Sequence, residues 1–181
     1  MSKIFGEIRQ IAFIVNDIDE AMRFWSDTLG IGPFFIKRKI TFSNYIYRGE
    51  KSISPTVSIA LANSGHLQVE LIQQHDDVPS IYKEFIDSGQ KSMQHASSWF
   101  TTEELKAKKS ELLNKGYKIA QECIIPSSGV QLIYFSTENG PSSFIFEIAD
   151  LKEPEQYKRI ANIKQSHTEW DGKYIVHETN T

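Results

Sequence analysis

Two segments of the chain show the same order of structural signals, and this repeat limits the possible folds more than any other feature. Each begins with a strand-like run, "RQIAFIV" in the first and "QHASSWF" in the second, and continues into a helix-forming segment. Asp17 and Glu20 form a capping-box pattern at the start of the first predicted helix, and Thr101 and Glu104 do so for the second. A glycine ends each helix. The sequence therefore predicts two related modules.

Three strand-like stretches follow each predicted helix. They read "PFFIKRKITF", "PTVSIAL" and "HLQVELIQ" in the first copy, and "KIAQECII", "VQLIYFS" and "SSFIFEIA" in the second, where the loop "TENGP" precedes the last strand. We place module one at residues 4–75 and module two at residues 92–150, with a linker helix at 77–89. Residues 151–181 remain as a C-terminal extension. Internal similarity at this length indicates two stacked modules rather than a solenoid.

Length and composition exclude several classes of protein. The 181 residues suit one well-cored domain, and a net charge of −3 offers no bulk attraction for nucleic acid or an anionic membrane. The longest apolar run, "IAFIV", is too short to cross a bilayer, and "MSKIFGEIRQ" lacks a signal-peptide core. The single cysteine, Cys123, lies in a predicted strand, where we expect a small structural residue. These features lead us to expect a cytoplasmic protein.

The closing strand of each module carries one carboxylate among apolar residues. In "LQVELI", Glu70 lies on the face opposite Val69, and in "FIFEIA", Glu147 lies on the face opposite Phe146. A single glutamate of this kind most often faces solvent on the wet side of a sheet. Here both modules have one, and Gln10 and His95 both open first strands. Four potential donor side chains therefore occupy equivalent places in two repeats.

These residues give the chain a resemblance to the vicinal oxygen chelate superfamily, which includes glyoxalase I, methylmalonyl-CoA epimerase, extradiol dioxygenases and the bleomycin- and fosfomycin-resistance proteins. The resemblance covers about residues 8–150 and rests on "RQIAFIV", "VELIQQ", "MQHASSWF" and "IFEIA". It implies an α+β fold in which two βαβββ modules form one domain, residues 1–150, with a curled, cup-like mixed eight-stranded sheet and helices outside. It also implies that Gln10, Glu70, His95 and Glu147 converge as metal ligands. Gln10 stands where many members have histidine.

One imidazole, two carboxylates and one amide oxygen, with no thiolate, suit Zn²⁺, Ni²⁺, Co²⁺ or Mn²⁺ with open positions. Non-haem iron dioxygenases need two histidine ligands, and only one of the four predicted ligands is a histidine, so a dioxygenase activity is disfavoured. His66, on the same strand alternation as Glu70, is an alternative ligand. An open Lewis-acidic site with two glutamates favours proton transfer beside a carbonyl. By resemblance, Glu147 is the first candidate for the base and Glu70 the second.

Three functions remain open. The connecting segment "VPSIYKEFIDSGQKSMQH" resembles that of methylmalonyl-CoA epimerases, which favours an epimerase acting on an acyl-CoA thioester. Gln10 matches lactoylglutathione lyase (glyoxalase I) better, which favours a glutathione adduct. A small-molecule binding protein without turnover, like the resistance proteins, is the third.

Basic residues and the tail suggest further contacts. Five basic residues on and after the second strand could meet CoA phosphates, or could simply form a solvated face: Lys37, Arg38, Lys39, Arg48 and Lys51.

We expect Ala12, Ile14, Gln68, Trp99 and Ile145 in the walls of the cup. We interpret residues 151–181 as a packed extension or a dimer contact, and we expect a homodimer.

Overall fold

The computed structural model describes residues 2–137, 144–152 and 154–179, and within them one eleven-stranded mixed sheet and four helices. The first module consists of β1 (Gln10–Ile14), α1 (Ile18–Leu29), β2 (Phe34–Ile40), β5 (Val57–Ser64) and β6 (Leu67–Gln74). The second consists of β7 (Met93–Phe100), α3 (Thr102–Asn114), β8 (Lys118–Ile125), β9 (Val130–Ser136) and β10 (Ile145–Asp150). The other elements are β3 (Ser43–Tyr47), β4 (Glu50–Lys51), α2 (Ile81–Asp87), α4 (Glu155–Glu169) and β11 (Val176–Glu178).

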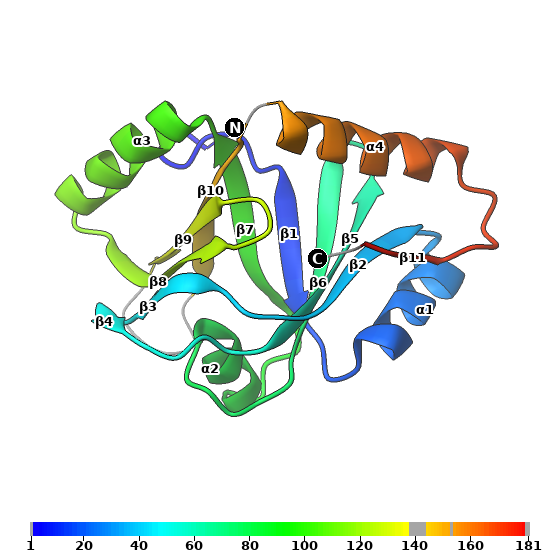
Figure 1. The fold of residues 1–181 in the computed structure, drawn as a ribbon, viewed down its shortest axis with the longest axis horizontal. Coiled ribbons are helices and arrows are strands. Elements are labelled where there is room, and N and C mark those ends of the chain that lie inside the picture. Colours follow the sequence, from blue (N-terminus) through cyan, green and yellow to red (C-terminus); the bar gives the residue numbers. More distant parts are fainter. Residues whose placement is uncertain (1, 138–143, 153, 180–181) are drawn as a thin grey trace.

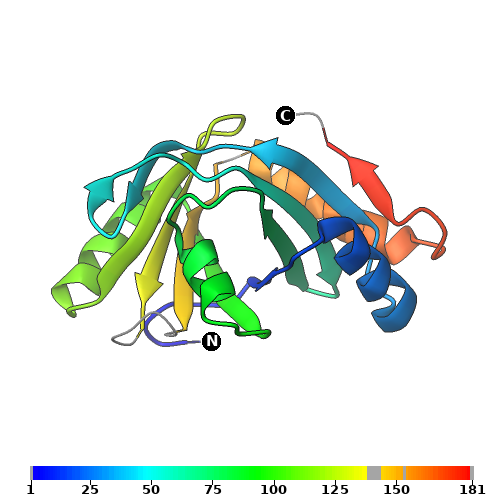
Figure 2. The same ribbon diagram turned by 90° about the horizontal axis from the view of Figure 1, so that it is seen from below.

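The two modules meet in the middle of the sheet, where β1 and β7 run antiparallel. Each of these strands pairs in parallel with the last strand of its own module, so the central order is β6-β1-β7-β10. The sheet arches around a hollow side and does not close into a barrel, as Figure 2 shows. The predicted fold class is therefore confirmed. Three short strands extend the predicted eight: β11 lies beside β2, and β3 and β4 lie beyond β8.

Local sequence signals place the two module helices as predicted. The Asp17 side chain accepts from the backbone N–H of Glu20, and Gly30 takes the left-handed conformation (φ 66°) that a side chain would disfavour. Thr101 and Glu104 form the complete reciprocal capping box of α3. Fixed starting points of this kind set the register of each helix relative to the strand before it.

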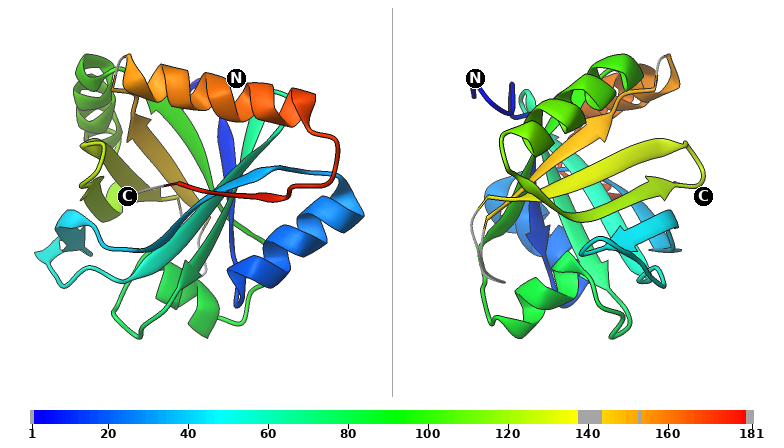
Figure 3. Two further views of the ribbon diagram at one scale, coloured as in Figure 1. Left: turned by 45° about the vertical axis from the view of Figure 1, so that its right-hand side comes forward. Right: turned by 90° about the vertical axis from the view of Figure 1, so that its left-hand side faces the viewer.

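The helices divide between the two sides of the sheet (Figure 1). α1 packs through Met22 on Val69 and Leu71, and α3 packs through Leu105 and Leu112 on the second module, both on the outer side. α2 and α4 lie on the hollow side instead. Tyr82 of α2 belongs to the inner cluster, and α4 crosses the opposite end of the sheet (Figure 3). The arch is thus covered at one end by the linker helix and at the other by the C-terminal segment.

Some predicted features fall outside the described residues. Residues 138–143 include most of the predicted loop 137–141 and the first two residues of the predicted strand 142–149. The division of the chain at residue 150 stays a prediction. Across the described part of the chain, no helix is long and apolar enough to span a membrane.

The far end of α4 is held at Gly32. A Cβ added there would lie 2.9 Å from the Trp170 ring, and His167 shares a hydrogen bond of 2.8 Å with the Gly32 carbonyl oxygen. We expect Gly32→Val to displace Trp170 and to loosen α4 by on the order of 1–3 kcal/mol, because a close contact between ring and backbone is lost. Hydrogen exchange of the α4 amides should then be about tenfold faster or more.

The control for this variant is Glu50→Val on the exposed strand β4, at the opposite edge of the sheet from β11. Its α4 amides should exchange at the wild-type rate. Unchanged exchange in Gly32→Val as well would mean that Trp170 does not hold the helix.

Candidate functional site

One row of side chains across the sheet brings Glu70 and His95 together. Ala12 on β1 is the register partner of both Glu70 on β6 and His95 on β7. Because the fully buried Ala12 has only a methyl group, the longer side chains on either side meet above it: His95 Nε2 lies 3.4 Å from Glu70 Oε2. Both atoms are buried, and neither has a hydrogen-bond partner among the described residues. Burying such groups costs free energy unless something else satisfies them.

The neighbouring row contains Gln10 and Glu147. Ser97 on β7 is the register partner of both residues, and Gln68 flanks Gln10 on the other side. The Gln10 amide nitrogen donates to Gln68 Oε1 at 2.8 Å, which leaves the Gln10 carbonyl oxygen outside that bond. The Ser97 hydroxyl donates to Glu147 Oε1 at 2.5 Å, and Glu147 Oε2 lies 3.9 Å from His95 Nε2. All four predicted residues therefore lie on the same side of the four central strands.

Gln94 fixes the orientation of His95. Its side-chain oxygen lies 2.6 Å from His95 Nδ1, and an amide oxygen is an acceptor only. In this hydrogen bond Nδ1 is therefore the donor, so a neutral imidazole keeps its lone pair on Nε2, the atom that faces Glu70. A hydrogen bond on the far ring nitrogen is the arrangement found around metal-binding histidines.

The Glu147 carboxyl is set up to hold a proton. Burial has the largest effect on its pKa and raises it. The positive form of His95 lowers the pKa, and the nearby Glu70 carboxylate raises it. Hydrogen bonds with the Ser97 and Tyr134 hydroxyls lower the pKa by favouring the charged form. The net direction is upward. Raised carboxyl pKa values of this kind are typical of acid–base sites.

The donor set suits a divalent cation, although the side chains do not form a finished site. Within the described residues, no three His, Cys, Asp or Glu side chains stand close enough to hold a metal ion as they are. The fit rests on the two buried atoms without partners, Glu70 Oε2 and His95 Nε2, which face each other. A cation between them would satisfy both, and Glu147 and the Gln10 oxygen are oriented toward the same side.

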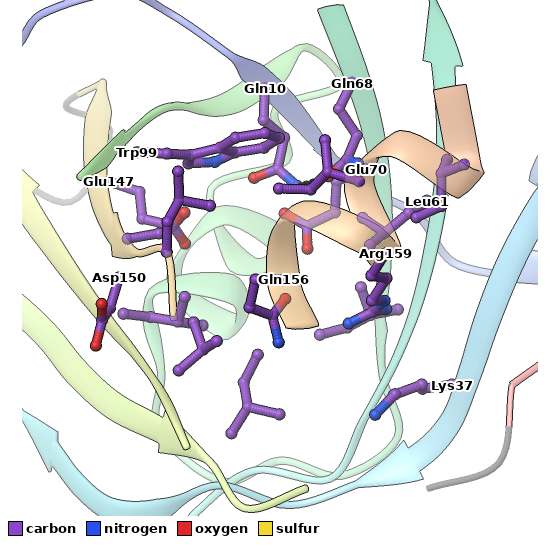
Figure 4. Close-up of a pocket in the computed structure, with 18 of the residues that line it drawn as sticks. Gln10, Lys37, Leu61, Gln68, Glu70, Trp99, Glu147, Asp150, Gln156 and Arg159 are labelled. Atoms are coloured by element: carbon purple, nitrogen blue, oxygen red, sulfur yellow. Dashed lines mark hydrogen bonds between the residues drawn. The ribbon is translucent and has the colours of Figure 1, made fainter. Parts of the chain in front are cut away.

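A pocket of about 100 Å³ opens over this cluster. Figure 4 shows Glu70 and Glu147 reaching into it from opposite sides, with Trp99 above them and Gln156 and Arg159 across from them. Apolar side chains form most of the remaining wall: Ile40, Ile59, Leu61, Ile125, Val130, Leu132, Ala149, Leu151, Ile160 and Ile163. A small polar group at the base of an apolar chamber is a usual design for a ligand site.

The predicted walls are correct in part. Gln68 and Trp99 line the pocket, whereas Ala12, Ile14 and Ile145 belong to the packed cluster beneath it. Ala12 and Ile145 are buried within this cluster, whereas Ile14 is half-buried and packs against it.

The remaining wall comes from a segment that the repeat does not include. Gln156, Arg159, Ile160 and Ile163 of α4 lie on one helical face, at a spacing that the sequence does show. The three polar residues that orient the cluster, Gln68, Gln94 and Ser97, carried no signal of that role in the sequence.

Of the five basic residues considered for phosphate binding, only Lys37 lines the pocket. Arg38 pairs with Asp19 at 2.7 Å and with Glu178 at 2.8 Å, and Arg48 pairs with Glu84 at 2.5 Å. These ion pairs hold the Arg38 and Arg48 side chains away from the pocket.

His66 is also excluded as a ligand, since it is exposed and lies 3.0 Å from the Lys164 amine. Cys123 lies in a strand, as predicted, and is buried in the inner cluster.

Comparisons with solved structures give the same fold at low sequence identity. A hypothetical protein from Bacillus halodurans C-125 superposes with a TM-score of 0.57 and 16% identity, over 82% of this chain and 96% of that one. Methylmalonyl-CoA epimerase from Mycobacterium tuberculosis gives 0.57 and 13%, over 87% and 95%. A Streptomyces coelicolor methylmalonyl-CoA epimerase in complex with 2-nitronate-propionyl-CoA gives 0.50 and 12%, over 82% and 96%.

The family model described as "Glyoxalase/Bleomycin resistance protein/Dioxygenase superfamily" matches residues 9–135. A comparison with curated proteins finds no match. The match to the family model includes both first strands and both module helices, and the structure contains the doubled module that the superfamily resemblance predicted. The chain therefore belongs to the glyoxalase/bleomycin resistance protein/dioxygenase superfamily.

Proposed function

We propose that this protein is a metal-dependent isomerase or epimerase that moves a proton on the carbon beside a carbonyl group. The observation that carries this proposal is the placement of two carboxylates. Glu70 and Glu147 come from β6 and β10, the strands on either side of the central pair, and face the pocket from opposite sides (Figure 4). A substrate between them would have one carboxylate near each face of its reacting carbon, as epimerisation requires.

The two carboxylates have different surroundings, which suggests different roles. Glu147 has a raised pKa and a hydroxyl donor on Oε1, so it suits a group that takes and returns a proton. Glu70 presents a buried oxygen without a partner toward His95, which suits a metal ligand. We therefore assign the base to Glu147 and place Glu70 second.

Gln10, Glu70, His95 and Glu147 would hold the divalent ion, with Glu147 free of it when it accepts a proton. When bound, such an ion supplies Lewis acidity that stabilises negative charge developing on the carbonyl oxygen. The chain itself contributes the fixed orientation of His95 by Gln94, the hydroxyl of Ser97 on Glu147, and an apolar wall that limits water around the reacting carbon.

The substrate that we favour is methylmalonyl-CoA or a related acyl-CoA thioester. Two of the three similar structures named above are methylmalonyl-CoA epimerases, and one of these contains a CoA derivative. At 12–13% identity this likeness concerns the fold, so the substrate is part of the proposal. The apolar chamber beside the carboxylates would take the acyl group.

A glyoxalase I reaction is the second candidate, and the observation that favours it is Gln10. Its amide nitrogen is held by Gln68, which directs the carbonyl oxygen to serve as a ligand in place of imidazole. The substrate would then be the glutathione adduct of methylglyoxal. The same proton-transfer chemistry serves both reactions.

The test is incorporation of solvent deuterium. The protein is incubated with Zn²⁺, Ni²⁺, Co²⁺ or Mn²⁺ in deuterated water, with methylmalonyl-CoA in one arm and the methylglyoxal adduct in the other. Mass spectrometry should find deuterium at the carbon beside the carbonyl of one compound, only when metal is present. Absence of exchange with either compound, together with tight binding of an unrelated small molecule, would favour the non-catalytic binding function.

Our proposal also includes a homodimer in the cytoplasm. Light scattering coupled to size-exclusion chromatography tests the first point, since a dimer should show twice the 20.7 kDa of the chain.

A further inference from the structure

Two basic side chains stand where the pocket opens into an outer groove. The pocket over the carboxylates and this groove share Lys37, Gln156, Arg159 and Ile163. The groove is also lined by Lys152, Lys158, Ser127 and Ser128, with one carboxylate, Glu155, among its lining residues. A ligand that extends from the carboxylate cluster into the groove would run beside Arg159 and Lys37, which Figure 4 shows on one side of the pocket.

Neither cation is neutralised by an ion pair. In residues 2–137, 144–152 and 154–179, the Lys37 amine donates to the Ser127 hydroxyl at 2.7 Å, and Arg159 forms no salt bridge. Lys37 and Arg159 are close enough that Arg159 lowers the pKa of Lys37, after the larger effect of burial. Burial also lowers the pKa of Arg159, while the Glu70 carboxylate raises it. A guanidinium remains charged throughout, so two partly buried positive charges face the same passage.

Charge is therefore separated along the pocket. Glu70 and Glu147 lie at the base, and the third carboxylate in the lining, Asp150, accepts a hydrogen bond of 2.8 Å from Thr102 on the outer side. Lys37 and Arg159 lie at the opening. A ligand with a reactive carbon at one end and an anionic group at the other would match both ends at once.

We propose that Lys37 and Arg159 form an anion-binding site that anchors an acidic group of the substrate, and that α4 is the element that completes this site. The inference rests on the proposed function for what lies at the base of the pocket. The planar guanidinium would take a carboxylate or a phosphate oxygen pair, and the Lys37 ammonium would take the same group from the other side. The substrate class is then an acidic carbonyl compound, with its anion at the mouth.

The test measures binding without turnover. The metal-depleted protein, residues 1–181, is titrated with malonate, with inorganic phosphate and with neutral malonamide, and binding is followed by NMR chemical shifts. Malonate or phosphate should bind, malonamide should not, and Arg159→Met should weaken binding about tenfold to hundredfold, as loss of a charge-assisted hydrogen bond predicts. Lys37→Met should weaken it as well, and Arg159→Lys should restore part of it.

Arg38→Met is the matched control, because Arg38 lies on the same strand as Lys37 and is occupied by Asp19 and Glu178. It should bind the anions as wild type does, and thermal unfolding checks that each variant is folded. Stronger binding of malonate identifies a carboxylate as the anchored group, and stronger binding of phosphate identifies a phosphorylated tail. Equal binding by wild type and folded Arg159→Met, or no binding of either anion, would overturn the inference. Deuterium exchange is measured separately, so a lack of catalysis does not affect this result.

Discussion

The double variant His95→Ala with Glu147→Gln is expected to bind divalent metal on the order of a hundredfold more weakly than wild type, or not at all, while it stays folded. The reason is that His95 Nε2 has no partner within the described residues except the carboxylates that face it, so its removal takes away the one nitrogen ligand of the set. Open metal sites contribute less to folding than closed structural ones. Elemental mass spectrometry of the dialysed protein measures the bound metal. Circular dichroism checks that the variant is folded.

A suitable control is His66→Ala with Glu122→Gln. His66 is exposed, and Glu122 pairs with Lys109 at 2.6 Å, so this variant has the same chemical changes away from the pocket. It should retain the metal. Unfolding of the first variant alone would mean that His95 and Glu147 serve the stability of the inner core rather than a metal.

Glu147→Gln alone is expected to reduce deuterium exchange by about a thousandfold, within the range that a positioned base contributes. The amide keeps the size of the side chain and an acceptor oxygen for Ser97, but it cannot take a proton. Glu70→Gln should instead lower metal affinity first, because Glu70 supplies the buried oxygen that faces His95. Exchange rates at saturating metal therefore separate the two residues.

The control for this pair is Glu84→Gln. Glu84 belongs to α2 and pairs with Arg48 at 2.5 Å, away from the pocket lining. Its exchange rate should equal that of wild type. If Glu70→Gln lost exchange at saturating metal and Glu147→Gln did not, the two assignments would have to be reversed.

The sequence was sufficient for those parts of the fold that depend on neighbouring residues. Asp17 and Thr101 cap their helices through bonds that close within three residues, and the strict alternation around Glu70 and Glu147 determines which face each side chain takes. Local rules of this kind can be read from a single chain. They were enough to predict two modules and four candidate donors.

The remaining features depend on contacts between distant segments. Ser97 supports Glu147 only because β7 and β10 pair in one particular register, and a shift of one residue would turn either side chain to the other face. The strand β3 pairs with β8 of the other module, which no local pattern in "SNYIY" indicates. In the same way, no local pattern around Arg159 indicates that this side chain lines a pocket. Which segments meet is a tertiary property, and single-sequence reasoning does not reach it.

The position of α4 has a consequence for how the specificity of this protein can change. The base of the pocket is built from strands of both modules, whereas one wall, with Gln156 and Arg159, is built from a helix that follows them in the chain. Under the proposed function, substitutions in α4 would therefore alter which compounds enter without disturbing the groups that handle the proton. Exchange of this helix between homologues would then transfer ligand preference as a unit, while the proposed reaction would depend on the sheet.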